Sequence, residues 1–239
     1  MNKDNNHPEE VGGRYAKFAL TILVIVYVFN FIDRQILTIL AEEIQADLGI
    51  SDSGIGFLYG TAFAVFYSVV GIPLGRLADV WTRKNLISIG LATWSIFTVL
   101  SGTARSFTGL AVYRFGVGVG ESSASPSAYS LLSDYFSPKV RTTVLAIYSS
   151  GVYIGAGIGL FLGGAIVEYW NSTYPDPSLA PLGIKGWQAA FMAVGLPGLL
   201  LALVVWQIKE PKRGLSDGIE TPIHPTPFKE MFKEMIGLT

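Results

Sequence analysis

Four charged residues stand out because they lie inside long apolar stretches of the sequence. They form two clusters, Asp33 with Arg34 and Arg114 with Glu121. An ionised side chain that faces lipid costs about 2.5 to 3.5 kcal/mol at the centre of a membrane helix. We therefore expect all four to face a protein interior or a watery cavity, where acids and arginines neutralise one another. The chemistry open to such a set is proton uptake and release by the acids and anion binding by the arginines.

The pairing of these residues is predicted from their depth along two helices. Counting about 1.5 Å per residue from the outer helix ends places Asp33 about 12 Å deep and Arg114 about 9 Å deep. Arg34 lies at about 10 Å and Glu121 at about 20 Å, a gap that the long arginine side chain partly covers. Arg114 and Glu121 are seven residues apart and so share one helix face. The predicted ion pairs are Asp33 with Arg114 and Arg34 with Glu121.

Such pairs can act as a proton switch. Burial disfavours the charged form of a carboxyl group, whereas an adjacent arginine favours it. Separating a pair should let the acid take up a proton, and re-forming the pair should release it. We predict Asp33 as the main proton-coupling site and Glu121 as the second, with Arg114 and Arg34 as their charge partners. The alternative is that the pairs only hold two helices together, although buried ion pairs seldom stabilise a fold more than apolar packing does.

The elements that must position these charges are long apolar segments. Of the 239 residues, 50% are hydrophobic and 15% are charged, and the mean hydropathy is +0.45, which excludes an ordinary soluble globule. Each segment is long enough, or nearly so, to cross about 30 Å of hydrocarbon as a helix, and none alternates like a barrel strand. The prediction is an all-α membrane protein with six transmembrane helices, at 16–41, 54–78, 86–102, 108–135, 142–167 and 187–208. The segments between them, such as 42–53 and 171–186, are expected to be polar linkers.

The distribution of Lys and Arg predicts the orientation. Basic residues concentrate at one side of the predicted helices, and such an excess marks the cytoplasmic side. We therefore expect a multi-pass protein of the cell (inner) membrane with both ends of this chain in the cytoplasm. Its parts are an N-terminal tail (1–15), the six-helix bundle (16–208) and a cytoplasmic linker (209–239).

The linker contains a predicted helix with one apolar face. The face is formed by Phe228, Met231, Phe232, Met235 and Ile236. This helix is expected to lie on the membrane surface or against another domain, with recruitment of a partner protein as the alternative.

Composition excludes several classes of function. The chain has 17 Lys and Arg against 18 Asp and Glu, so it lacks the basic excess that binds nucleic acid. It has no cysteine, and both histidines, His7 and His224, lie in polar tails, so a thiol nucleophile and a Cys/His metal cluster are excluded. An intramembrane enzyme using Asp33 and Glu121 as acid and base is a rival, but no nucleophile is paired with a base. We predict no enzyme activity, no metal and no cofactor, with the proton as coupling ion.

A motif rich in glycine and charge follows the second apolar segment. It reads Gly75-Arg76-Leu77-Ala78-Asp79-Val80-Trp81-Thr82-Arg83-Lys84. Glycine suits a tight turn, and the aspartate can bond neighbouring helix ends. Taken alone, the motif also fits a simple basic loop. It resembles the signature between the second and third helices of the major facilitator superfamily, Gly-x-Leu-Ala-Asp-x-x-x-Arg-Lys, with Val80 where a basic residue and Thr82 where a glycine are usual.

Other motifs agree with this resemblance. Arg114 to Glu121 resembles the superfamily pattern on the fourth helix, and Glu210-Pro211-Lys212-Arg213-Gly214 resembles the exit from the sixth. The Asn30 to Arg34 segment, together with Gly120-Glu121 and Pro126, looks most like the spinster-like branch.

Glycines four residues apart mark the fifth segment, at Gly151, Gly155, Gly159 and Gly163. This spacing indicates close helix packing. It also resembles the superfamily's antiporter pattern, but with Leu160 where proline is expected, so antiport is not established.

The resemblance implies the N-terminal six-helix bundle of a transporter, built as two three-helix inverted repeats with the first and fourth helices lining a central path. Pro126 is expected to kink the fourth helix, and the nearby Ser122, Ser123, Ser125 and Ser127 are expected to line water or to satisfy the freed backbone groups. The resemblance also implies a cytoplasmic gate, made by Gly75, Asp79, Arg83, Lys84, Asp134 and Arg141. The predicted substrate cavity is lined by Asn30, Tyr27, Phe31, Tyr59 and Phe63, although membrane aromatics also serve for packing.

The expected function is proton-coupled secondary active transport by alternating access. The resemblance implies amphipathic lipids, of the lysophospholipid or sphingolipid type, or organic anions as substrates. The alternative is a small water-soluble organic anion or sugar, bound directly by Arg34 and Arg114. Superfamily members have two six-helix halves, so the expected partners are the substrate, the membrane and a C-terminal half in the same protein or in a separate chain.

Overall fold

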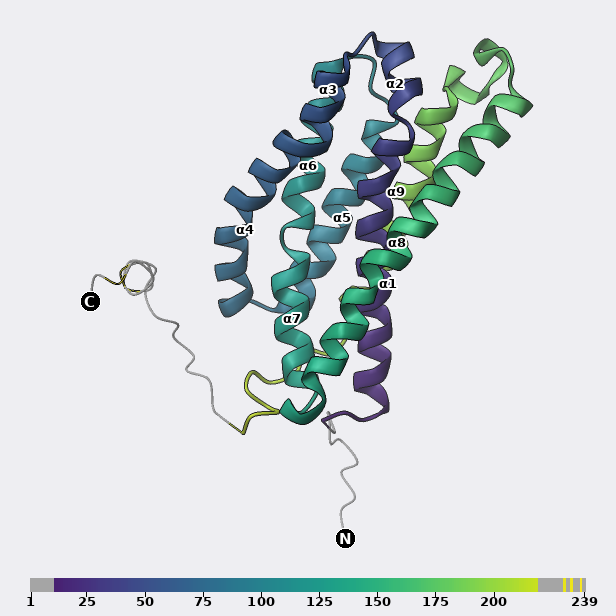
Figure 1. Cartoon of the computed structure of the whole chain (residues 1–239). Coiled ribbons are helices and arrows are strands. Elements are labelled where there is room, and N and C mark those ends of the chain that lie inside the picture. The colour runs from purple at the N-terminus through teal and green to yellow at the C-terminus, as the bar shows by residue number, and fades with distance from the viewer. Residues whose placement is uncertain (1–10, 219–229, 231–232, 234–236, 238–239) are drawn as a thin grey trace.

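The computed structural model describes residues 11–218 together with residues 230, 233 and 237. All regular elements within that part of the chain are helices. The bundle consists of α1 (Arg14–Ile39), α4 (Ala62–Val80), α5 (Arg83–Ser101), α6 (Phe107–Glu121), α7 (Ala124–Tyr135), α8 (Pro138–Thr173) and α9 (Gly186–Trp206) (Figure 1). The five residues of the predicted apolar face in the linker and both histidines lie outside the described residues.

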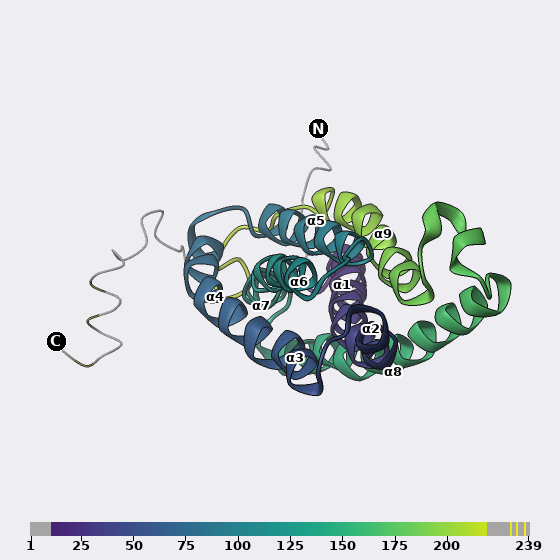
Figure 2. The same cartoon turned by 90° about the horizontal axis from the view of Figure 1, so that it is seen from above.

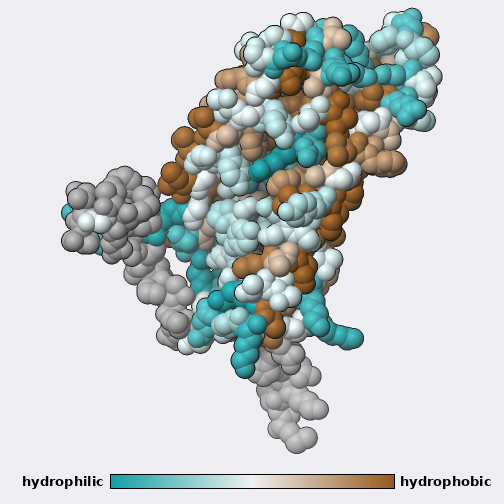
Figure 3. All heavy atoms as spheres, in the orientation of Figure 1, coloured by the Kyte–Doolittle hydropathy of each residue, from teal (hydrophilic) through white to brown (hydrophobic). Residues whose placement is uncertain are grey.

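The helices form the predicted six spanning segments. Within the described chain, four stretches are each long and apolar enough to cross a membrane: Arg14–Ile39, Asp52–Val80, Pro138–Thr173 and Gly186–Trp206. Helix α5, with 19 residues, runs beside them. Helices α6 and α7 follow one another and together have a length similar to that of the other segments (Figure 1). Hydrophobic residues cover much of the flanks between two more hydrophilic ends, and a hydrophilic patch reaches into the middle of the face in view (Figure 3).

The fourth segment is broken rather than kinked at the predicted position. Helix α6 ends at Glu121 and α7 begins at Ala124, so the break precedes Pro126. Proline lacks an N–H, and its ring opposes the carbonyl four residues earlier, which here belongs to Ser122. The hydroxyl of Ser122 donates to the carbonyl of Val119 at 2.8 Å, and that of Ser123 donates to the carbonyl of Gly120 at 2.9 Å. The predicted backbone role of these two serines is confirmed.

The segment 42–53 is not the expected polar linker. It holds α2 (Ala41–Leu48) and the start of α3 (Asp52–Gly56), which continues through a π-helix (Phe57–Thr61) into α4. Ile44 is the buried anchor of α2. Gly49 ends that helix in the left-handed conformation, at φ +64°. A short helix with charges on its outer side and one apolar anchor carries too little periodicity to be distinguished from a loop.

The packing of α8 against α1 explains the glycines four residues apart. Helix α1 lies between α8 and α9, and α6 lies between α4 and α5 (Figure 2). A Cβ atom added at Gly155 would stand 2.5 Å from the carbonyl oxygen of Val28, and one at Gly159 would stand 3.1 Å from the Cα atom of Ile32. Glycine is therefore what lets the two helices approach so closely, and the predicted packing role is confirmed.

We expect Gly155→Ala to destabilise the protein by about 1 to 3 kcal/mol, because the methyl group would force α1 and α8 apart. The measurement is the free energy or midpoint of unfolding in detergent. The control is Gly157→Ala on the same helix, where an added Cβ atom meets nothing within 4 Å. That change should be neutral or gain up to about 1 kcal/mol from helix propensity. Equal losses at the two positions would contradict the packing role of Gly155.

Candidate transport site

The buried charges lie where one hydrophobic cluster gives way to another. Along α6, Ala111 belongs to one cluster and Val117 to the other, and Arg114 lies between them. Along α1 the change falls between Val26 and Ile32, next to Asp33. The polar site is therefore an interruption in the core of the bundle.

The first ion pair joins α1 to α6. Nη1 of Arg114 donates to Oδ1 of Asp33 at 2.7 Å, and each side chain is 3% exposed. The hydroxyl of Thr98, on α5, donates to the other carboxylate oxygen of Asp33. Thr98 was not predicted as a site residue, and its signal in the sequence is a hydroxyl in the middle of an apolar segment. Three helices thus converge on one carboxylate.

The second ion pair joins Arg34 to Glu121. Nε of Arg34 donates to Oε2 of Glu121 at 2.8 Å, and the Glu121 side chain is fully buried. The other oxygen, Oε1, is buried and has no hydrogen-bond partner among the described residues. Both pairs predicted from depth are present, and Glu121 is held by fewer donors than Asp33.

An aromatic cage surrounds the guanidinium of Arg34. Its Cζ lies 4.7 Å from the ring centre of Phe63 and 5.0 Å from those of Phe31 and Tyr67. Such contacts favour a cation electrostatically. The cage holds Arg34 beside Glu121 while leaving the side chain 26% exposed.

A cavity of about 350 Å³ opens beside this cage. Its walls carry both arginines and one face of α4 with the π-helix before it: Arg34, Arg114, Tyr59, Gly60, Phe63, Ala64, Tyr67 and Ser68. Of the predicted cavity residues, Tyr59 and Phe63 line it. Phe31 reaches only the cage. Tyr27 instead stacks on Tyr148, with ring centres 4.4 Å apart, and Asn30 is buried in α1.

A second polar cluster, the Arg83 network, lies at the end of the bundle where α4, α7 and α9 end. Arg83 is 1% exposed and forms an ion pair with Asp134 and another with Glu210, the latter at 2.8 Å. It also donates to the hydroxyl of Ser130 and to the carbonyl of Pro211, each at 2.9 Å. The structure therefore brings together Arg83 and Asp134 of the predicted gate.

The other predicted gate residues divide into two groups. The backbone N–H of Lys84 donates to Glu210 at 3.1 Å, and Arg141 pairs with Asp217 at 2.8 Å. Asp79 does not reach Arg83: its side chain is 60% exposed and lies 3.7 Å from Arg76. Gly75 lies within α4 rather than in a turn, because the helix continues to Val80.

The segment that follows α9 connects the Arg83 network to the end of α4. Arg213 donates to the carbonyls of Ala78 and Trp81 at the end of α4, each at 2.7 Å. Burial, followed by the nearby charge of Arg83, lowers the pKa of Arg213 from its usual value. Glu210 and Arg213 were not predicted as gate residues, although both belong to the motif noted at the exit from the sixth helix. The described residues contain no group of three or more acidic or histidine side chains placed to hold a metal.

Comparison with known proteins decides the family. The sequence model of the Major Facilitator Superfamily matches residues 23–237. The chain belongs to this superfamily. Members of this superfamily are transporters, so the match does not support the rival prediction of an intramembrane enzyme. Asp33, Arg114, Glu121 and the Arg83 network all fall within the matched residues.

Spinster proteins are among the superfamily members most similar to the chain. The crystal structure of a bacterial homolog to the human lysosomal transporter spinster, inward-facing and occupied, is 37% identical, with a TM-score of 0.79 over 86% of this chain and 47% of its own. An MFS-type efflux pump of Mycolicibacterium smegmatis is 31% identical over 84% of this chain and 44% of its own. A sphingosine-1-phosphate transporter of Danio rerio is 30% identical over 83% and 37%. The predicted spinster-like resemblance is confirmed, and the chain spans less than half the length of each relative.

Proposed function

We propose that the chain is one six-helix half of a proton-coupled transporter for amphipathic lipids that carry an anionic headgroup. The observation that carries this proposal is the cavity of about 350 Å³ lined by two arginines and an aromatic wall. Guanidinium groups bind phosphate and carboxylate groups, and the rings of Phe63 and Tyr67 suit an apolar chain. The sphingosine-1-phosphate transporter among the relatives supports a substrate of this class.

Proton coupling would use the two buried carboxylates. Each is paired with an arginine that also lines the cavity, so an anionic headgroup would compete with Asp33 and Glu121 for the same guanidinium groups. A carboxylate that loses its arginine in a buried site takes up a proton. Substrate binding and protonation are thereby linked, and no cofactor other than the proton is involved.

Alternating access would require a second six-helix half, in the same protein or in a separate chain. Helix α4 presents large apolar side chains to the outside, including Val69 and Ile72, which are 63% and 64% exposed. A second half or lipid would cover them. The basic excess near the Arg83 network supports a cytoplasmic location for that end, with the protein in the inner membrane. The network would then be the cytoplasmic gate.

The substrate class is tested with proteoliposomes that contain the chain together with its second half. Uptake of a lysophospholipid or a sphingosine phosphate should respond to an imposed pH gradient. Uptake of a sugar acid without any lipid transport would instead favour the second candidate, a carrier of small organic anions, which the two cavity arginines also suit.

We expect Phe63→Ala to raise the KM for the lipid at least about tenfold, because the lost ring surface is worth about 1.5 to 3 kcal/mol. The matched control is Phe66→Ala, since Phe66 lies on the same helix and stacks on Phe115 outside the cavity. Lipid KM values that change equally in the two variants would remove the assignment of this wall to the lipid chain.

A further inference from the structure

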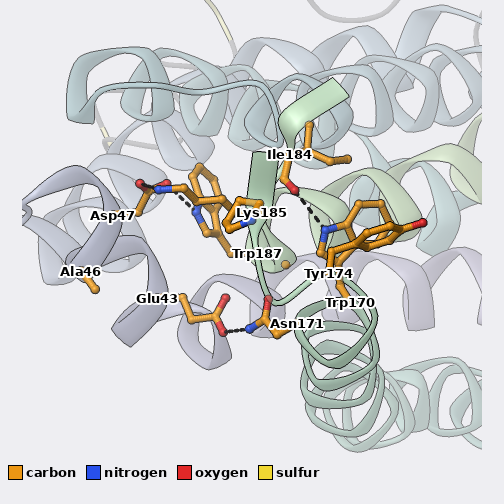
Figure 4. A pocket seen from close by; sticks show the side chains of 11 residues that line it. Glu43, Ala46, Asp47, Trp170, Asn171, Tyr174, Ile184, Lys185 and Trp187 are labelled. Atoms are coloured by element: carbon orange, nitrogen blue, oxygen red, sulfur yellow. Dashed lines mark hydrogen bonds and ion pairs between the residues drawn. The ribbon is translucent and has the colours of Figure 1, made fainter. Parts of the chain in front are cut away.

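A separate cavity of about 310 Å³ lies at the end of the bundle opposite the Arg83 network. It is an open cavity lined by α2, the last turn of α8, the segment that follows α8 and the start of α9 (Figure 4). Its size lies at the lower end of the range for small-molecule sites. Its walls come from α2 and from the region between the end of α8 and the start of α9, which lie far apart in the sequence, and neither ion pair of the transport site belongs to it.

The charges around this cavity leave one carboxylate without a cationic partner. Asp47 is neutralised, because it accepts bonds from Nζ of Lys185 and, at 2.9 Å, from the indole N–H of Trp187. Glu43 accepts a bond only from the neutral amide of Asn171, at 2.9 Å, among the described residues. Figure 4 shows the Glu43 carboxylate and Asn171 facing each other across the space below Lys185. The site as a whole therefore carries one unbalanced negative charge.

Aromatic rings form two of the walls. Trp187 stands on one side, and Trp170 with Tyr174 stands on the other (Figure 4). The indole N–H of Trp170 donates to the carbonyl of Ile184 at 3.0 Å, and that of Trp187 is held by Asp47. Both indole donors are occupied, and Trp187 is 1% exposed. The half-buried rings of Trp170 and Tyr174 are therefore the ones that can offer a ligand their π surface. A negative charge that shares a cavity with an accessible aromatic wall is an environment that binds an organic cation.

We propose that this cavity is a binding site for a quaternary ammonium group of the choline class. A primary ammonium would need several acceptors for its N–H groups, and Glu43 supplies one carboxylate in largely apolar surroundings. A quaternary ammonium has no N–H to satisfy, and it gains from both the charge of Glu43 and the rings of Trp170 and Tyr174. The group can come from free choline or from a phosphocholine headgroup at the membrane surface.

The test is binding of choline and tetramethylammonium to the purified protein in a maltoside detergent, followed by tryptophan fluorescence and calorimetry. The comparison ligand is 3,3-dimethylbutanol, which has the shape of choline without its charge. We expect saturable binding of the two cations and at least tenfold weaker binding of the alcohol. Equal binding of the alcohol would overturn the proposal.

Variants locate the site. Glu43→Gln keeps an acceptor for Asn171 and should weaken choline binding about tenfold, whereas Glu42→Gln, an exposed neighbour on the same helix, should leave it unchanged. Trp170→Leu should weaken binding as well, and Glu43→Gln remains decisive if that variant fails to fold. Choline affinity that is unaffected by Glu43→Gln, or equally reduced by Glu42→Gln, would refute the site.

Nanodiscs distinguish the two sources of the quaternary ammonium group. If headgroups occupy the site, phosphatidylcholine discs should lower the affinity for added choline relative to phosphatidylglycerol discs. Equal affinities would identify free choline as the ligand.

Discussion

Replacing Asp33 with Asn is expected to abolish transport driven by a pH gradient while leaving the protein folded. The amide cannot exchange a proton in this range, but its oxygen still accepts from Arg114. Thr98 can turn its hydroxyl hydrogen fully to the carbonyl of Trp94, to which it already donates at 2.9 Å, and accept from the new NH₂ group. Accumulation of substrate under the gradient should fall at least about tenfold, equivalent to about 1.4 kcal/mol of lost coupling.

The measurement compares gradient-driven uptake with exchange at equal pH on the two sides of proteoliposomes. Exchange should persist, since it does not require net proton movement. Asp52→Asn is the matched control, because Asp52 is an exposed acid outside the bundle core. Undiminished accumulation in Asp33→Asn would remove Asp33 from the coupling mechanism and leave Glu121 as the coupling acid.

Replacing Arg83 with Ala is expected to destabilise the protein by about 3 to 5 kcal/mol, the usual cost of leaving buried partners of an ion pair unpaired. Asp134 and Glu210 would both lose their guanidinium partner, as would Ser130 and the carbonyl of Pro211. For a chain of this size the change corresponds to a fall of roughly 6 to 20 °C in the unfolding midpoint.

Thermal unfolding in detergent checks this expectation. Arg83→Lys should lie between the wild type and Arg83→Ala, because an ammonium keeps the charge but lacks the planar set of five donors. Arg105→Ala, which removes an exposed arginine at the other end of the bundle, should change the midpoint little. If Arg83→Ala unfolds at the same temperature as Arg105→Ala, the Arg83 network contributes nothing to stability and its role is confined to gating.

The ion pairs could be predicted because depth along a membrane helix depends only on residue count. A charge in an apolar segment must find a partner at its own level, which leaves few choices for Asp33 and Arg114. The packing role of the glycines of α8 could be predicted for a related reason, because their spacing puts them on one helix face. The spacing on a helix is thus the part of the site that sequence determines directly.

Other features depend on contacts between segments far apart in the chain and were missed or wrong. Asp79 shares a motif with Arg83, yet α4 extends past it and leaves it exposed. Glu210 reaches Arg83 only because α9 brings it to the same end of the bundle. Helix α2 could not be predicted within the polar segment 42–53, because Ile44 is its single fully buried residue. Thr98 was missed because a lone hydroxyl does not show which helix it will face.

The break between α6 and α7 gives the two helices a hinge. Helix α6 carries Arg114 and Glu121, and α7 carries Asp134. The hinge at Ser122 already lacks some of the backbone hydrogen bonds of a continuous helix. Changing the angle there therefore breaks fewer hydrogen bonds than bending an unbroken helix would. In the proposed mechanism, a proton gained or lost at Glu121 would reach the Arg83 network as a tilt of α7 relative to α6.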